Sequence, residues 1–316
     1  MEILLKALYL LIFPGLLYAS AAGLLLAGID RKVLARMQKR VGPPVLQPAY
    51  DFFKLLGKET IVPAAAARRT FLAAPVVGLV SLVVTAVLVP VFGFSPFGGV
   101  ADMVVLLYLL TIPAVAVIMG GAASGSPYAG VGVSREMVAL MAYELPLVIV
   151  LLAVGKTAGG EGVTFSLSAI VAYQQAHGPL IGDWTLWPAA LALLLVIPAE
   201  IGSHPFDVAE AETEICEGTL VEYSGAPLAV FKLSHAIKLY IMTALFSCLF
   251  LSGWGTGLVV VDALLLLALC AVITLVCVTL VRAVCARLKV EVLFRFYWRV
   301  VAVLAAVSLL LAWLVA

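Results

Sequence analysis

Residues 258–283 read LVVVDALLLLALCAVITLVCVTLVRA. In this run of 26 residues, only Asp262 and Arg282 are charged. A transmembrane α-helix requires about 20 consecutive, predominantly apolar residues. The segment is therefore predicted to cross a membrane as a helix.

The same apolar character extends over the whole chain. Of its 316 residues, 64% are hydrophobic and 12% are charged, whereas soluble domains carry about 25% charged residues. The sequence therefore predicts an all-α integral membrane protein, with residues 1–316 forming a single membrane domain. About eight spans are expected, at residues 4–29, 71–94, 101–121, 134–155, 184–201, 227–252, 258–283 and 293–315. The weaker segment 163–175 is interpreted as an amphipathic or re-entrant piece between the fourth and fifth spans.

Several classes of site are missing from the sequence. The net charge of +1 gives no indication of nucleic-acid binding. The five cysteines form no C-x-x-C pair, and no phosphate-binding loop or H-E-x-x-H motif occurs. We therefore expect small buried cysteines and no metal or nucleotide site. The A-x-A at residues 19–21 lies in an apolar run that continues to Ile29, so we expect a retained first helix rather than a signal peptide.

The positive charges are distributed asymmetrically. Fifteen of the 19 Lys and Arg residues lie in residues 30–69, at Arg135 or in residues 282–299, which are alternate connections between the expected spans. Because cytoplasmic loops carry an excess of Lys and Arg, this face is predicted to be cytoplasmic. Eight spans then place both termini outside, and residues 30–70 and 200–226 become long cytoplasmic loops.

The first of these loops is basic. Three of its residues recur every four positions and are expected to form one stripe on a helix: Lys32, Arg36 and Arg40. Consecutive prolines in Gly42-Pro43-Pro44 are expected to end that helix. After Pro48 a second, amphipathic helix is predicted, with Asp51, Lys54 and Lys58 on one face. Two interpretations stay open for it, a shaped docking loop and an anchor on the lipid surface.

The second loop is acidic, since residues 200–226 contain seven Asp and Glu residues and no Lys or Arg. Pro205 can open a helix and Gly218 can close it. Four carboxylates would then share one face: Asp207, Glu210, Glu214 and Glu217. Their repulsion is expected to raise some pKa values or to place Arg and Lys opposite them. Relaying protons and docking a basic surface both remain open, and the two loops of opposite sign are expected to pair with each other, with a soluble partner, or both.

Four ionisable residues lie inside the expected spans, where such residues usually serve a function: Glu144, Lys232, His235 and Lys238. Counted from the start of its helix, Glu144 is about 13 Å deep and Lys238 about 16 Å. One interpretation is a static ion pair between the buried Glu and a buried Lys. The other is a chain in which these groups exchange protons with water. Glu136 and Asp262 are either the ends of such a path or boundary charges, and the second interpretation is favoured.

Four motifs together resemble the respiratory complex I subunit 1 (H-subunit) family. They are Arg36-Met-Gln-Lys-Arg-Val-Gly-Pro-Pro-Val-Leu-Gln-Pro48, Asp51-Phe-Phe-Lys-Leu-Leu-Gly-Lys-Glu59, Pro205-Phe-Asp-Val-Ala-Glu-Ala-Glu-Thr-Glu214 and Glu222-Tyr-Ser-Gly225. Within this family the chain looks closest to the membrane anchor subunit of group 4 membrane-bound [NiFe]-hydrogenases, the formate hydrogenlyase or energy-converting type. The resemblance covers nearly the whole chain.

This resemblance implies a subunit without a catalytic centre, which anchors a peripheral arm in the cell membrane of a prokaryote. The implied partners are a hydrogenase-like large subunit with the [NiFe] centre, a small subunit with iron–sulfur clusters, and antiporter-like membrane subunits. The loop residues under the arm would be Arg36, Arg40, Gln47, Asp51, Lys54, Lys58 and Glu59. The implied path for protons or sodium contains Glu200, Asp207, Glu210, Glu212, Glu214 and Glu217, and leads to Glu144, Lys232, His235 and Lys238.

Two alternatives stay open. The first is the quinone-site subunit of an NADH:quinone oxidoreductase (complex I), although the connection Gly42–Pro48 is shorter than the matching stretch in quinone-reducing members. The second is an independent ion-coupled transporter, which would hold its substrate at interrupted spans. We find no matching pair of interrupted spans in the sequence.

Overall fold

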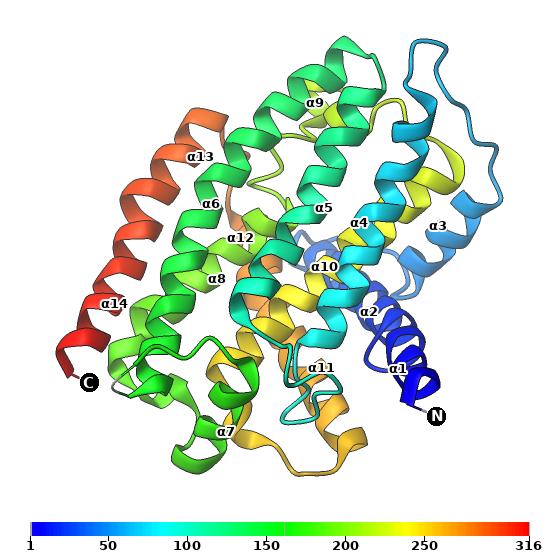
Figure 1. Cartoon of the computed structure of the whole chain (residues 1–316). Coiled ribbons are helices and arrows are strands. Elements are labelled where there is room, and N and C mark those ends of the chain that lie inside the picture. Colours follow the sequence, from blue (N-terminus) through cyan, green and yellow to red (C-terminus); the bar gives the residue numbers. More distant parts are fainter. Residues whose placement is uncertain (1, 161, 316) are drawn as a thin grey trace.

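A computed structural model describes residues 2–160 and 162–315. The described chain is almost wholly helical, and no β-strand occurs in it (Figure 1). Eight of its helical segments are long and apolar enough to cross a membrane. The expected all-α membrane fold with eight spans is therefore confirmed.

The helices follow one another along the chain as α1 (Glu2–Leu11), α2 (Leu16–Met37), α3 (Gln47–Leu56), α4 (Arg68–Leu88), α5 (Met103–Ala123), α6 (Pro127–Gly159), α7 (Leu167–His177), α8 (Trp187–Ile201), α9 (Glu212–Ile215), α10 (Gly225–Phe250), α11 (Val259–Thr274), α12 (Leu280–Val284), α13 (Val290–Phe296) and α14 (Ala302–Val315). A π-helical segment, Leu275–Thr279, joins α11 to α12, and a second one, Tyr297–Val301, joins α13 to α14. The last two spans are therefore composite helices.

Helix α10 is the centre of the bundle. It runs through the middle of Figure 1 and packs against α2, α3, α4, α8 and α11. From Leu233 to Phe250 nearly every residue is buried, because helices cover it on all sides. The other spans keep one face exposed, as expected of helices that face lipid or further subunits.

The two ends of the bundle differ in character. We call the end formed by residues 38–67, 202–224 and 285–289 the loop end, and the opposite end the far end. Both termini and α7 lie at the far end (Figure 1). Trp184, Trp187 and Trp254 are exposed there, which is typical of side chains at a membrane–water interface. The three charged connections share one end, as predicted, whereas the side of the membrane that this end faces stays a prediction.

The expected spans differ from the observed helices in two places. The first apolar run is interrupted at residues 12–15, and α2 then continues to Met37, so residues 30–37 belong to a helix and not to the loop. The fourth span, α6, has 33 residues instead of the expected 22, which makes it about 50 Å long. The weaker segment is the 11-residue helix α7, which is too short to cross a bilayer.

The predicted basic stripe is wrong at its last member. Helix α2 ends at Met37, and Lys39 has a positive φ of 60°, so Arg40 lies beyond the helix. Lys32 and Arg36 remain on α2. The amphipathic helix after Pro48 is confirmed as α3, which places Pro48 and Phe52 against the bundle and Tyr50 and Phe53 outward. Its predicted charged face is wrong at Lys58, because α3 ends at Leu56.

The predicted acidic helix from Pro205 to Gly218 is also wrong. Only the four residues of α9 are helical there. Cys216 and Glu217 have positive φ values of 48° and 68°, and Gly218 has a φ of 50° next to the carbonyl oxygen of Ala209, where any Cβ would collide. The acidic side chains therefore leave the backbone in different directions. Cys248, Cys270 and Cys277 are buried as expected, whereas Cys216 and Cys285 are exposed.

We expect the substitution Gly23→Ala to destabilise the bundle. A Cβ at Gly23 would collide with the backbone of Ala236, so α2 would have to move away from the central helix α10. Overpacking of this kind costs about 1–3 kcal/mol. The matched control is Gly130→Ala on α6, where nothing lies within 4 Å of the added Cβ. Thermal unfolding of both purified variants tests this, and equal midpoints would contradict the expectation.

Candidate functional site

A cavity of about 320 Å³ opens between α10 and the loop end. Its walls come from α2, α3, α4, α5, α6, α8, α10 and the acidic loop. Part of the lining is apolar, for example Leu24, Phe52, Leu82, Val117 and Phe231. Nine ionisable residues complete it: Arg31, Asp51, Glu136, Glu200, Asp207, Glu210, Lys232, His235 and Lys238. The cavity therefore brings together most of the ionisable residues that the sequence singled out in the membrane and the acidic loop.

The three ionisable residues of α10 face this cavity from one side of the helix, as their spacing of three residues predicts. Lys232 and His235 are exposed within it, whereas Lys238 is buried at 7% exposure. The two lysines and the histidine therefore line the cavity from the loop end toward the core of the bundle.

Lys238 forms a buried ion pair with Glu200. Its Nζ atom lies 2.9 Å from the Oε1 atom of Glu200, and the two side chains are 9% and 2% exposed. Glu200 is positioned by the last turn of α8, which ends at Gly202 in a left-handed conformation. The static pair considered between Glu144 and a buried lysine is therefore wrong for Lys238, because its partner comes from α8 and not from α6.

Glu136 lies elsewhere than the favoured interpretation places it. Its position after Arg135 favours a boundary charge, but it lines the cavity from α6. Helix α6 extends past the expected start of the span, so a residue that looked terminal lies within the helix. Asp262, by contrast, accepts hydrogen bonds from the backbone N–H groups of Thr256 and Gly257, in the connection that precedes α11.

Glu210 contributes a carboxyl group from the acidic loop. Burial raises the pKa of Glu210 to about 7, and the negative charges of Glu136 and Asp207 add to this rise while Lys232 opposes it. A carboxyl group with this pKa exchanges its proton near neutral pH. Glu210 is thus suited to take up and release protons at the mouth of the cavity.

Glu144 lies further along α6, about 12 Å beyond Glu136. Its side chain is half-buried beside the exposed Met141 and Leu145, and no ion pair or hydrogen bond to its carboxylate occurs among the described residues. Between the two glutamates, the buried hydroxyl of Tyr143 also lacks a hydrogen-bond partner. This hydroxyl lies within electrostatic range of Glu200, Glu136 and Glu144. Sequence patterns did not single it out, because a tyrosine in an apolar helix usually contributes to packing.

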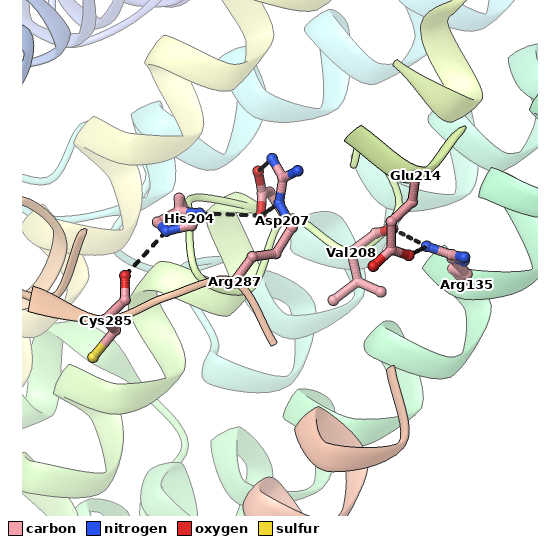
Figure 2. Close-up of polar contacts among 7 residues, drawn as sticks. All are labelled: Arg135, His204, Asp207, Val208, Glu214, Cys285 and Arg287. Atoms are coloured by element: carbon pink, nitrogen blue, oxygen red, sulfur yellow. Dashed lines mark hydrogen bonds and ion pairs between the residues drawn. The ribbon is translucent and has the colours of Figure 1, made fainter. Parts of the chain in front are cut away.

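Two arginines hold the acidic loop in place (Figure 2). Arg287, between α12 and α13, donates two hydrogen bonds to Asp207 at 3.0 and 2.5 Å. Arg135 of α6 donates to Glu214 at 2.5 Å. The expected pairing of the acidic loop with the basic loop is therefore wrong for these two acids, whose partners come from elsewhere. The two loops do meet at a hydrogen bond of 3.0 Å from the N–H of Ile61 to Ser224.

His204 links the acidic loop to the same connection. Its Nε2 atom lies 3.1 Å from the carbonyl oxygen of Cys285, and its Nδ1 atom lies 3.6 Å from Asp207 (Figure 2). Glu217 is exposed at the surface of the loop. The side chain of Glu212 lies outside the described part of the structure.

The residues predicted to lie under a peripheral arm divide into two groups. Gln47 and Asp51 turn inward, since Asp51 accepts hydrogen bonds from Gln47 at 2.9 Å and from Arg31 at 3.2 Å and lines the cavity. The others are exposed at the loop end, namely Arg36, Arg40, Lys54, Lys58 and Glu59. Their docking role stays a prediction.

We expect Lys238→Met to destabilise the protein because Glu200 would keep a buried charge without its partner. Removing one member of a buried pair costs about 3–5 kcal/mol. Adding Glu200→Gln removes the orphaned charge and should recover most of this loss. The control is Arg295→Met in the exposed pair with Glu291, where at most about 1 kcal/mol is expected. Thermal unfolding of the parent protein and the three variants tests this, and a double variant no more stable than Lys238→Met would refute it.

We expect Glu210→Gln to change how stability depends on pH. The raised pKa of Glu210, about 7 against an ordinary 4.5, favours the neutral carboxyl in the folded state. The contribution of the neutral Glu210 carboxyl group to the stability of the folded state is complete below pH 4.5 and is lost as the pH rises to about 7. A glutamine does not ionise, so the variant should gain stability relative to the parent between pH 5 and pH 8.

Unfolding midpoints at several pH values measure this difference. Glu291→Gln removes an exposed carboxylate and should leave the pH profile of the parent protein in place. Parallel profiles for Glu210→Gln and the parent protein would contradict the assignment.

Comparisons with known proteins agree over nearly the whole chain. A family model described as NADH dehydrogenase matches residues 8–313. The H subunit of the NADH-quinone oxidoreductase of Thermomicrobium roseum is 36% identical over 309 residues, which cover 90% of this chain and 89% of the relative. Hydrogenase-4 component C of Escherichia coli is 36% identical over 228 residues, which cover 72% of this chain and 70% of the relative.

A solved structure has the same fold. It is a chain of the membrane-bound sulfane sulfur reductase, an archaeal respiratory membrane complex, with a TM-score of 0.89 and 30% identity over 99% of this chain and 100% of that chain. The resemblance seen in the sequence motifs is thereby confirmed. This chain belongs to the NADH dehydrogenase family, the complex I subunit 1 (H-subunit) family, and is a membrane subunit of complex I-like and group 4 hydrogenase-like respiratory complexes.

Proposed function

We propose that this chain is the membrane anchor and ion-coupling subunit of a group 4 [NiFe]-hydrogenase-type complex. The observation that carries the proposal is the cavity, where acidic side chains of α6, α8 and the acidic loop face Lys232, His235 and Lys238 of α10. A peripheral arm with a hydrogenase-like large subunit and an iron–sulfur small subunit would lie over the loop end. Antiporter-like membrane subunits would complete the complex.

The proposed ion path begins at the loop end and descends to α6. Asp207 and Glu210 lie at its entrance, and Lys232 and His235 line the cavity next. The pair of Lys238 with Glu200 follows, and Tyr143 with an ordered water would connect this region to Glu144. We propose that protons follow this path, because carboxyl, imidazole and ammonium groups all exchange protons with water.

Coupling rests on the charge balance of the cavity. An ion pair in a poorly solvated place is sensitive to any charge that arrives nearby, because the low dielectric transmits the field. Electron transfer in the arm above would change the charge next to Glu210 and Asp207. The proton distribution among Glu136, Glu200 and Glu144 would then shift in response. This chain supplies the ionisable groups, and the redox centres would belong to its partners.

Glu144 is the proposed exit toward the next membrane subunit. A half-exposed carboxyl group deep in a membrane is costly if lipid surrounds it. The exposed face of α6 around Glu144 is therefore the surface on which we place an antiporter-like partner. By the distribution of Lys and Arg, the loop end would be cytoplasmic and both termini would lie outside, in the cell membrane of a prokaryote.

A second candidate function is quinone binding in an NADH:quinone oxidoreductase. The volume of about 320 Å³ and the partly apolar lining of the cavity favour it, as do the relatives named as H subunits of NADH-quinone oxidoreductase. The two lysines of α10 in the cavity and the short connection Gly42–Pro48 favour the hydrogenase-type role. The relatives are named as parts of larger enzymes, which supports a subunit over an independent transporter.

We expect Glu144→Gln to abolish proton translocation by the reconstituted complex while donor-dependent hydrogen evolution persists in detergent. The carboxyl group is lost, whereas its volume and the peripheral arm are retained. Lys238→Met should also abolish translocation. The control Met141→Leu changes a neighbouring exposed side chain on α6 and should pump like the parent protein. Acidification of the lumen of proteoliposomes measures pumping, and normal pumping by Glu144→Gln would refute the path.

The same preparation separates the two candidate functions. Hydrogen evolution that is indifferent to added quinone and to quinone-site inhibitors supports the hydrogenase-type role. Quinone-dependent oxidation of NADH that such inhibitors block would overturn it in favour of a complex I subunit.

A further inference from the structure

A second pocket lies at the loop end, outside the proposed ion path. It has a volume of about 450 Å³. Three guanidinium groups form its rim: Arg31 of α2, Arg40 of the following connection and Arg282 of α12. Leu34, Ala35 and Pro43 supply an apolar floor, of which Leu34 and Ala35 are buried. We call this the arginine pocket.

The rim has a surplus of one positive charge. Arg282 lies 3.0 Å from Asp30, which also accepts a hydrogen bond from Thr279. Arg31 lies 3.2 Å from Asp51. The guanidinium of Arg40 instead contacts the neutral side-chain oxygen of Gln38. Two of the three arginines therefore have carboxylate partners, and the third leaves one charge that a monoanion would balance.

The depth of the pocket relative to the bilayer indicates which kind of anion can reach it. Arg282 lies in the last turn of the composite span Val259–Val284, which has 26 residues. Such a span is about 39 Å long, whereas the hydrocarbon core of a bilayer is about 30 Å thick. The end that carries Arg282 therefore emerges among the lipid headgroups, and the contact with Asp30 places α2 at the same depth. An apolar floor beneath a cationic rim fits a group that is charged at one end and apolar at the other.

We propose that the arginine pocket binds the phosphodiester headgroup of an anionic phospholipid. The phosphate accepts hydrogen bonds from Arg40 and from the free N–H groups of the other two guanidinium groups. A guanidinium group is planar and can donate two parallel hydrogen bonds to the oxygens of one phosphate. The glycerol backbone covers Leu34, Ala35 and Pro43. Basic pockets between membrane helices on the cytoplasmic side are known to favour anionic lipid headgroups.

Lipid titration of the intact, delipidated complex tests this proposal. Phosphatidylglycerol is added in mixed micelles, and the unfolding midpoint and the bound lipid phosphorus are measured together. In Arg40→Gln the mole fraction of lipid that gives half of the effect should rise about fivefold, since one arginine near an anionic surface has an effect of this size. Arg40→Lys retains the charge but loses the paired N–H groups. Its half-effect mole fraction of lipid should lie between the values of the parent protein and Arg40→Gln.

The matched control is Arg69→Gln, which removes the same charge from an exposed position in the first turn of α4 outside the pocket. It should titrate like the parent protein. Phosphatidylcholine at the same mole fraction should not stabilise the complex, because its headgroup has no net charge.

Three results would overturn the proposal. An equal shift in Arg69→Gln and Arg40→Gln would show attraction to the surface without a site. Equal stabilisation by inorganic phosphate would assign the pocket to the free anion instead of a lipid. A structure of the assembled complex with a carboxylate of the peripheral arm between the three arginines would assign it to a protein contact.

Discussion

The buried pair of Lys238 and Glu200 is the interaction on which the arrangement of the cavity depends. A lone charge at this depth would be strongly destabilising, so α8 and α10 must meet with their polar groups facing each other. Since α10 is enclosed by neighbours on all sides, its cationic face cannot turn to bulk solvent. Carboxylates from α6, α8 and the acidic loop surround that face instead, and a polar cavity forms inside an otherwise apolar bundle.

In the acidic loop, some carboxylates are neutralised by an arginine and others are not. Asp207 and Glu214 each have an arginine, from two separate parts of the chain. Glu210 lies between them along the sequence and meets mostly negative neighbours. The two ion pairs fix the backbone of the loop. This backbone holds Glu210 where burial and nearby negative charges oppose the ionisation of its carboxyl group. Glu214 thus has a structural role, whereas Asp207 combines its ion pair with a place in the lining of the cavity, next to Glu210.

Sequence reasoning was most reliable where a single physical constraint acts. The thickness of a bilayer set the number of spans, and the helical repeat placed Lys232, His235 and Lys238 on one face. Sequence reasoning failed where contacts between distant segments determine the local structure. The signals at Pro205 and Gly218 favour a helix, but pairing with Arg135 and Arg287 holds the loop in another shape. The partner of Lys238, the place of Glu136 and the isolated hydroxyl of Tyr143 depend on how α6, α8 and α10 pack, which no local pattern records.

Arg31 borders both the cavity and the arginine pocket, so one side chain lines both spaces. Its guanidinium is shared between an interior carboxylate, Asp51, and an exterior rim. Thermodynamic linkage then requires reciprocity: any ligand of one space that redirects Arg31 alters affinity in the other, and the reverse effect has the same magnitude. The composition of the surrounding membrane would in this way become a variable in the energetics of ion transfer.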